Sequence, residues 1–243
     1  MRLTTLGVDA DDTLWHCETV FRLTQERLAE LLAPYAGPAD LAAHLADVEA
    51  RNLRFYGYGV KGFTLSMIET ALAFAPDASG SVIREILAAG REMLTHPIEP
   101  LPGVEATLRR LADEYRLIVI TKGDLLDQER KIAVSGLGEY FSAVEIVSEE
   151  TPDTYARLFA RHGMGPADAA MVGNSLRSDI LPALEAGAYA AHIPYALTWA
   201  HEAGAAPLDH PRFAELTTFA EIPAWLEGLS RCASGAGFGP LVR

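Results

Sequence analysis

Short apolar runs separated by helix-length segments are the feature that most constrains how this chain can fold. Runs typical of buried strands lie at residues 3–9, 116–121, 142–148, 169–173 and 188–194. From residue 98 onward, each run is joined to the next by one segment with helical periodicity. Such alternation is typical of parallel strands connected by right-handed helical crossovers. The sequence therefore predicts a three-layer α/β core with a parallel sheet.

The alternation is interrupted after the first strand. Residues 17–95 repeat apolar side chains at helical spacing in four stretches separated by Pro and Gly, with no strand between them. We interpret this region as an all-helical domain inserted into the α/β core. The expected bounds are 1–15 and 97–232 for the core, 16–96 for the inserted domain and 233–243 for a loose tail. No structure is predicted for the segment 199–218.

Composition limits the kinds of partner. The chain has 20 Lys and Arg against 33 Asp and Glu, a formal net charge of −13, which argues against nucleic-acid binding because cationic side chains supply that affinity. No apolar run reaches the roughly 20 residues of a membrane-spanning helix. The two cysteines cannot form a disulfide framework or a Cys-rich zinc site. With no signal-peptide pattern either, we expect a cytoplasmic protein without nucleic-acid or membrane partners; the oligomeric state stays open.

An acidic turn follows the first strand, where Asp9, Asp11 and Asp12 fall within four residues. Their mutual repulsion can be relieved by raised pKa values or by a bound hard cation. In extended chain, residues i and i+2 lie about 7 Å apart on the same side. Asp9 and Asp11 could therefore flank one reacting centre, one as nucleophile and the other as general acid. The alternative is an Asp-rich helix N-terminus.

Two later strands end in polar residues as well. Thr121 ends the run at 116–121, and together with Lys122 and Gly123, which follow it, can donate side-chain and backbone hydrogen bonds to phosphate oxygens. After 169–173, Asn174 and Asp179 offer oxygen ligands in a turn that enters a helix, although Ser178 could also be a helix cap there. Since parallel strands end at one edge of the sheet, these groups are expected to share one site.

These motifs, in this order, resemble those of the haloacid dehalogenase superfamily. Residues 9–13 (DADDT) match its Asp-x-Asp-x-Thr signature, Thr121 its second motif, and residues 173–179 (GNSLRSD) resemble its fourth. The resemblance implies a Rossmann-like core, with residues 16–96 as the superfamily's helical cap. It also implies Mg²⁺-dependent phosphoryl transfer through a phospho-aspartate.

The resemblance also assigns roles to individual residues. Asp9 would be the nucleophile, and Asp11 would protonate the leaving oxygen and then activate water. The Asp9 and Asp179 side chains and the Asp11 backbone carbonyl would hold Mg²⁺. Thr121 would bind the phosphoryl oxygens, with Lys122, Gly123 and Asn174 as further phosphate- or substrate-binding candidates.

Two departures from the family pattern stand out. The lysine expected before the helix at 151–163 is replaced by Glu150 or Thr151. Of the chain's three lysines, we favour Lys122, beside Thr121, as the compensating cation, and we expect Lys131 to face solvent. Asn174 stands where an acid is common, which should weaken Mg²⁺ binding. Both departures lower the expected activity.

The leading functional interpretation is a Mg²⁺-dependent phosphatase that acts on a small phosphorylated metabolite. A phosphate-binding or regulatory protein with little turnover is the alternative from another class. A dehalogenase is disfavoured by Asp11, and a phosphonate-cleaving enzyme would need a Schiff-base lysine, for which Lys61 is the only candidate in residues 16–96. The sequence does not identify the substrate.

Overall fold

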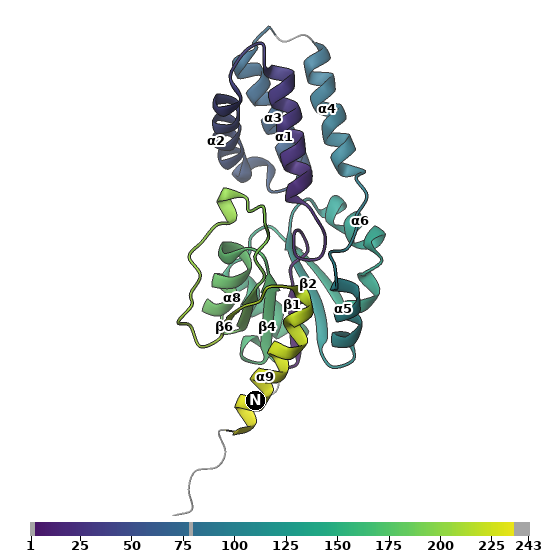
Figure 1. Cartoon of the computed structure of the whole chain (residues 1–243), viewed down its shortest axis with the longest axis vertical. Helices are drawn as coiled ribbons and strands as arrows, with labels where there is room; N and C mark the ends of the chain where they lie inside the picture. The colour runs from purple at the N-terminus through teal and green to yellow at the C-terminus, as the bar shows by residue number, and fades with distance from the viewer. Residues whose placement is uncertain (1–2, 78–79, 236–243) are drawn as a thin grey trace, which may run out of the picture.

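The computed structural model describes residues 3–77 and 80–235. It shows a parallel β-sheet with helices on both faces and a separate group of helices that stands at one end of the sheet (Figure 1). The α/β fold class predicted from the sequence is therefore confirmed.

The strands of the sheet all run parallel, in the order β3-β2-β1-β4-β5-β6. Their bounds are β1 Thr5–Val8, β2 Arg116–Lys122, β3 Ala143–Val147, β4 Ala169–Gly173, β5 Tyr189–His192 and β6 Phe213–Glu215. Val8 pairs with Val119 of β2 and with Val172 of β4. The three polar strand ends identified in the sequence therefore leave the sheet side by side at its carboxyl edge.

Helices cover both faces of the sheet. Helices α5 (Val104–Ala112), α6 (Leu125–Ser135) and α9 (Ile222–Gly235) pack on one face, and α7 (Pro152–His162) and α8 (Leu181–Glu185) on the other. Successive side chains of β2 point to opposite faces: Leu117 and Val119 join the first core and Ile118 and Ile120 the second. Burial on both faces explains why the central strands are continuous apolar runs.

The inserted helices lie between β1 and β2 in the chain. They are α1 (Glu18–Leu32), α2 (Pro38–Tyr56), α3 (Val60–Phe74) and α4 (Gly80–Leu94), and we call them the helical insertion. They enclose an apolar core of their own, which includes Leu28, Leu32, Leu45, Phe63, Met67 and Ile86. The four helical stretches expected from the sequence are thus present, whereas the domain bounds 16–96 stay a prediction.

The C-terminal part differs from expectation. Strand β6 and a short 3₁₀ helix at Ala200–Glu202 lie in the segment for which no structure was predicted. Helix α9, also not predicted, buries Ile222 and Leu226 against the sheet. It continues to Gly235, so residues 233–235 of the expected loose tail are helical, and residues 236–243 lie outside the described residues. Within the described chain, no helix combines the length and apolar character needed to span a membrane.

Candidate active site

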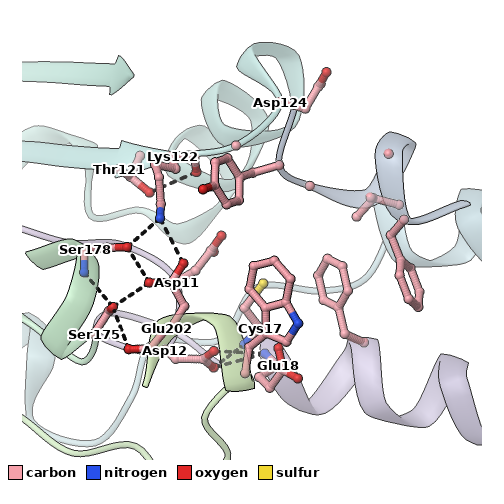
Figure 2. Close-up of a pocket in the computed structure, with 18 of the residues that line it drawn as sticks. Asp11, Asp12, Cys17, Glu18, Thr121, Lys122, Asp124, Ser175, Ser178 and Glu202 are labelled. Atoms are coloured by element: carbon pink, nitrogen blue, oxygen red, sulfur yellow. Dashed lines mark hydrogen bonds and ion pairs between the residues drawn. The ribbon is translucent and has the colours of Figure 1, made fainter. Parts of the chain in front are cut away.

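A cavity of about 170 Å³ lies where the carboxyl ends of β1, β2 and β4 meet the helical insertion. All the site residues predicted from the sequence line it: Asp9, Asp11, Thr121, Lys122, Gly123, Asn174 and Asp179. Figure 2 shows how side chains from the sheet edge and the helical insertion converge on it.

Asp9 lies directly after β1 and is 7% exposed. Its backbone N–H donates to the carbonyl of Val172 at 2.9 Å, and its carboxylate accepts a hydrogen bond from the Thr13 hydroxyl at 2.9 Å. Burial raises the pKa of Asp9 well above its usual range, and the carboxylates of Asp179 and Asp11 raise it further. An ionised Asp9 therefore needs a nearby positive charge.

Asp11 is held by a buried cation. Lys131 Nζ lies 2.7 Å from each of its carboxylate oxygens, Trp15 Nε1 donates at 2.7 Å and Gln128 Nε2 at 3.1 Å. Burial alone would raise the pKa of Asp11, but the charge and hydrogen bonds of Lys131 outweigh it, and the pKa is lowered. Asp11 is thus maintained as a carboxylate.

The predicted exposure of Lys131 is wrong, because the residue is buried. The prediction considered only the distance of Lys131 along its helix. Lys131 lies one turn after Gln128 and Asp127, on the face of α6 that meets the acidic turn, and all three are buried. Two lysines therefore reach the site, Lys131 at Asp11 and Lys122 at the end of β2; compensation by Lys122 stays a prediction.

Asp12 has a structural role. Its carboxylate accepts hydrogen bonds from the backbone N–H of Cys17 at 2.8 Å and of Glu18 at 3.0 Å, where α1 begins. Asp12 adopts φ 63°, a conformation that Asp tolerates better than most residues. Burial raises its pKa to about 7. The helix N-terminus interpretation thus holds for Asp12, although Asp12 lines the cavity together with Asp9 and Asp11.

Gln128 orders the loop after β2. Its Nε2 donates to the hydroxyl of Thr121 at 3.0 Å and to the carbonyl of Lys122. Gly123 has φ 136°, and a Cβ there would lie 3.0 Å from the Gln128 amide. Only glycine fits this turn well. The turn brings the backbone of the loop to the cavity.

The side chain of Lys122 turns toward the other strand ends (Figure 2). Its Nζ lies 2.6 Å from Ser178 Oγ, 2.8 Å from Glu202 Oε1 and 3.5 Å from Glu150 Oε2. Burial alone would lower the pKa of Lys122, but Glu150 and Glu202 raise it above the usual value. Lys122 is therefore a largely buried, charged ammonium group that reaches from the end of β2 toward Glu150, which stands where the family lysine was expected.

Asn174 and Asp179 follow β4. With its amide nitrogen facing them, Asn174 donates to the Asp11 carbonyl at 3.0 Å and to Asp9 Oδ2 at 3.1 Å. The Asp179 carboxylate accepts from the backbone N–H of Ser175 at 2.8 Å, and a Cβ on Gly173 would collide with it. The helical turn here is capped by the Ser175 hydroxyl, which accepts from the N–H of Ser178, so Ser178 is not the cap.

Three buried carboxylates could hold a cation. One oxygen each from Asp9, Asp179 and Glu150 all lie within 4.8 Å of one another. Burial and the charge of Glu150 raise the pKa of Asp179, and no hydrogen-bond partner is found for Glu150 Oε1 among the described residues. Hard oxygen donors of this kind suit Mg²⁺. Asp9 and Asp179 belong to the predicted metal set, whereas the Asp11 side chain binds Lys131.

The sequence patterns predicted no role in the site for four residues that the structure places there: Gln128, Lys131, Glu150 and Glu202. Gln128 and Lys131 stand three apart in a helix that directly follows Thr121, and that spacing was the available signal. Glu150 was noted only as a replacement for lysine. Glu202 comes from the segment left unassigned, so nothing in its local sequence placed it here.

Contacts between the helical insertion and the core close one side of the cavity. Lys61 Nζ pairs with Asp124 at 2.9 Å, and Tyr58 packs its ring against Trp199, with centroids 6.3 Å apart, and beneath Lys122 Nζ at 4.3 Å. Lys61 is thus engaged in an ion pair at the rim, which gives no support to a Schiff-base role.

The fold and the motif residues at the sheet edge define a class of protein. The chain belongs to the haloacid dehalogenase-like hydrolases, whose family profile matches residues 3–187. It is therefore a hydrolase of this family, as the sequence motifs indicated.

Solved structures agree with this assignment. A haloacid dehalogenase-like family hydrolase from Xanthomonas campestris is 38% identical with a TM-score of 0.86, covering 96% of this chain and 94% of that one. The hydrolase YfnB from Bacillus subtilis, solved bound to magnesium, is 17% identical with a TM-score of 0.66, covering 93% and 99% of the two chains. At that identity, the second similarity concerns the fold alone.

Characterised relatives of this chain are phosphatases. N-acylneuraminate-9-phosphatase of Rattus norvegicus is 31% identical over 134 residues, which are 52% of this chain and 51% of the relative. The chain thus spans about half the length of that relative in the match. Glyceraldehyde 3-phosphate phosphatase of Pyrococcus furiosus is 24% identical over 237 residues, 95% and 94% of the two chains.

Proposed function

We propose that this chain is a Mg²⁺-dependent phosphatase that hydrolyses a small phosphate monoester through a phosphorylated Asp9. The observation that carries the proposal is the cavity in which buried Asp9 lies beside Asp179, with Asp11 and Lys122 on the same sheet edge. The phosphatase relatives support the same reaction class.

In the first step an oxygen of Asp9 attacks phosphorus, and the bond to the leaving oxygen breaks. The Thr121 hydroxyl, the Lys122 ammonium and the Gly123 N–H bind the phosphoryl oxygens and offset their negative charge. Asp9 and Asp179, with the Asp11 carbonyl, would hold Mg²⁺. When bound, the ion would reduce the repulsion between the Asp9 carboxylate and the phosphate.

Asp11 acts on protons in both steps. It donates to the leaving oxygen and then, as a carboxylate, takes a proton from the water that hydrolyses phospho-Asp9. Lys131 favours the carboxylate form, so Asp11 is best suited to the second step. Leaving groups of low basicity, which need less protonation, should be the better substrates.

The helical insertion would act as the cap that contacts the leaving group. Its cavity wall combines apolar and polar side chains, namely Phe21, Gln25, Glu49, Asn52, Leu53 and Phe63. A cavity of about 170 Å³ fits a small metabolite. We propose a phosphorylated metabolite of the cytoplasm as the substrate class.

Phosphate release from a panel of small monoesters, with Mg²⁺ and with EDTA, tests the proposal. We expect Mg²⁺-dependent release by the wild type and none by Asp9→Asn. A rapid quench in cold acid preserves an acyl phosphate, and hydroxylamine should then release the phosphate and leave a hydroxamate on Asp9. Tight phosphometabolite binding without release would favour the low-turnover alternative and refute the proposal.

A further inference from the structure

Glu150 is a buried carboxylate that the proposed mechanism does not use. It lies between β3 and α7, directly before Thr151, whose side chain caps α7. The Glu150 side chain is 2% exposed, and one of its oxygens is within 4.8 Å of carboxylate oxygens of Asp9 and Asp179. Glu150 therefore faces the site from a third strand end.

Pairing with Lys122 does not account for Glu150. Lys122 Nζ already has Glu202 at 2.8 Å, whereas Glu150 Oε2 lies at 3.5 Å. Within residues 3–77 and 80–235, Glu150 Oε1 is buried and has no hydrogen-bond partner. A buried charged oxygen without a partner is strongly destabilising, and a cation bound between the three carboxylates would satisfy it.

The three oxygens lie close enough together to converge on one divalent ion. Mg²⁺ binds oxygen at 2.0–2.1 Å, so adjacent octahedral ligands stand about 3 Å apart and opposite ones about 4.2 Å. The three oxygens, all within 4.8 Å of one another, would draw together around a bound ion. The neutral Asn174 replaces an acid common in the family. A third carboxylate at Glu150 restores the missing negative charge.

We propose that Glu150 is a direct ligand of the divalent cation, together with Asp9 and Asp179, in place of the acid that position 174 lacks. The assignment rests on the proposed Mg²⁺-dependent function. It differs from the metal set that the family resemblance implies, because it draws a ligand from the end of β3.

Calorimetric titration of MgCl₂ into the substrate-free full chain tests the proposal without an activity assay. Glu150→Gln removes the charge and keeps the size, and Glu202→Gln is the matched control, because Glu202 also pairs with Lys122 but lies outside the three-carboxylate group. We expect Glu150→Gln to weaken Mg²⁺ binding at least about tenfold, and Glu202→Gln less than about threefold. Circular dichroism verifies that each variant is folded.

Two results would overturn the proposal: wild-type Mg²⁺ affinity in Glu150→Gln, or equal losses in both variants, which would reduce Glu150 to a counterion of Lys122. Should Glu150→Gln not fold, Glu150→Asp retains the charge but shortens the side chain, and a ligand role again requires weaker binding. Phosphate release by the wild type is measured in a separate assay. An active, Mg²⁺-binding wild type with an unaffected Glu150→Gln refutes only the ligand role, whereas a wild type that neither binds Mg²⁺ nor releases phosphate refutes the proposed function.

Discussion

Replacing Lys131 by methionine removes the cation that holds Asp11 and preserves most of the side-chain volume. In the wild type, Lys131 Nζ lies 2.7 Å from both Asp11 oxygens, and the two side chains are 8% and 28% exposed. The variant leaves the Asp11 carboxylate with only its hydrogen bonds from Trp15 and Gln128. A buried negative charge then lacks its counterion.

The expected cost follows from this geometry. Removing one partner of a buried ion pair costs about 3–5 kcal/mol. Because Asp11 keeps two hydrogen bonds and is partly exposed, we expect the lower end, about 3 kcal/mol at pH 8. For a chain of this size the melting temperature should fall by about 6–12 °C.

The cost should depend on pH. In the wild type, the pKa of Asp11 is lowered in the folded state, so its contribution to stability is present above the unfolded pKa of about 3.9 and is lost as pH falls through the folded pKa. The pKa of Lys131 is raised, so its contribution is complete below its unfolded pKa of about 10.4. In Lys131→Met, only the hydrogen bonds from Trp15 and Gln128 still oppose burial, so we expect the pKa of Asp11 to rise. The loss of stability should therefore be larger at pH 8 than at pH 5.

Urea unfolding followed by circular dichroism at pH 5 and pH 8 measures this difference. The double variant Lys131→Met/Asp11→Asn should recover more than half of the loss at pH 8. Lys61→Met is the matched control, because the Lys61–Asp124 pair is largely exposed and should cost at most about 1 kcal/mol. Equal losses at both pH values, or no recovery in the double variant, would refute the ion-pair reasoning.

Three further substitutions test the site. Asp9→Asn should reduce phosphate release more than about 1,000-fold, with an unchanged or higher urea midpoint because a buried charge is removed; release within about tenfold of the wild type would exclude Asp9 as nucleophile. Lys122→Met should lower kcat/KM at least about 100-fold, and a loss below threefold would contradict its phosphoryl contact. Gly173→Ala should displace Asp179, and a wild-type Mg²⁺-dependent shift in melting temperature would contradict that displacement.

Much of the fold could be predicted because its strands are buried on both faces. Residues 117–120 are all apolar and buried, and β2 places them alternately in two separate cores. Strand β6 could not be found in the same way, because Phe213–Glu215 spans only three partly exposed residues. Helix α9 carries an apolar stripe through Ile222 and Leu226 that the sequence interpretation did not use.

The site was predictable where it depends on strand ends and unpredictable where it depends on packing. Asp9 and Asn174 each follow a parallel strand and Thr121 lies near the end of another, and parallel strands must end at one edge. The contact of Lys131 with Asp11 depends on how α6 is rotated against the sheet, which spacing along the helix does not reveal. Glu202 contacts Lys122 although it stands 80 positions later in the chain. It belongs to a segment with no regular sequence pattern.

The hydrogen bonds that the Asp12 carboxylate accepts from the start of α1 have a mechanical consequence. They fasten the base of the helical insertion to the same short loop that carries Asp9 and Asp11. Tilting of the insertion relative to the sheet would pull on this loop three residues from the attacking oxygen. We therefore expect ligand entry and the alignment of the Asp9 and Asp11 carboxylates to be coupled through Asp12.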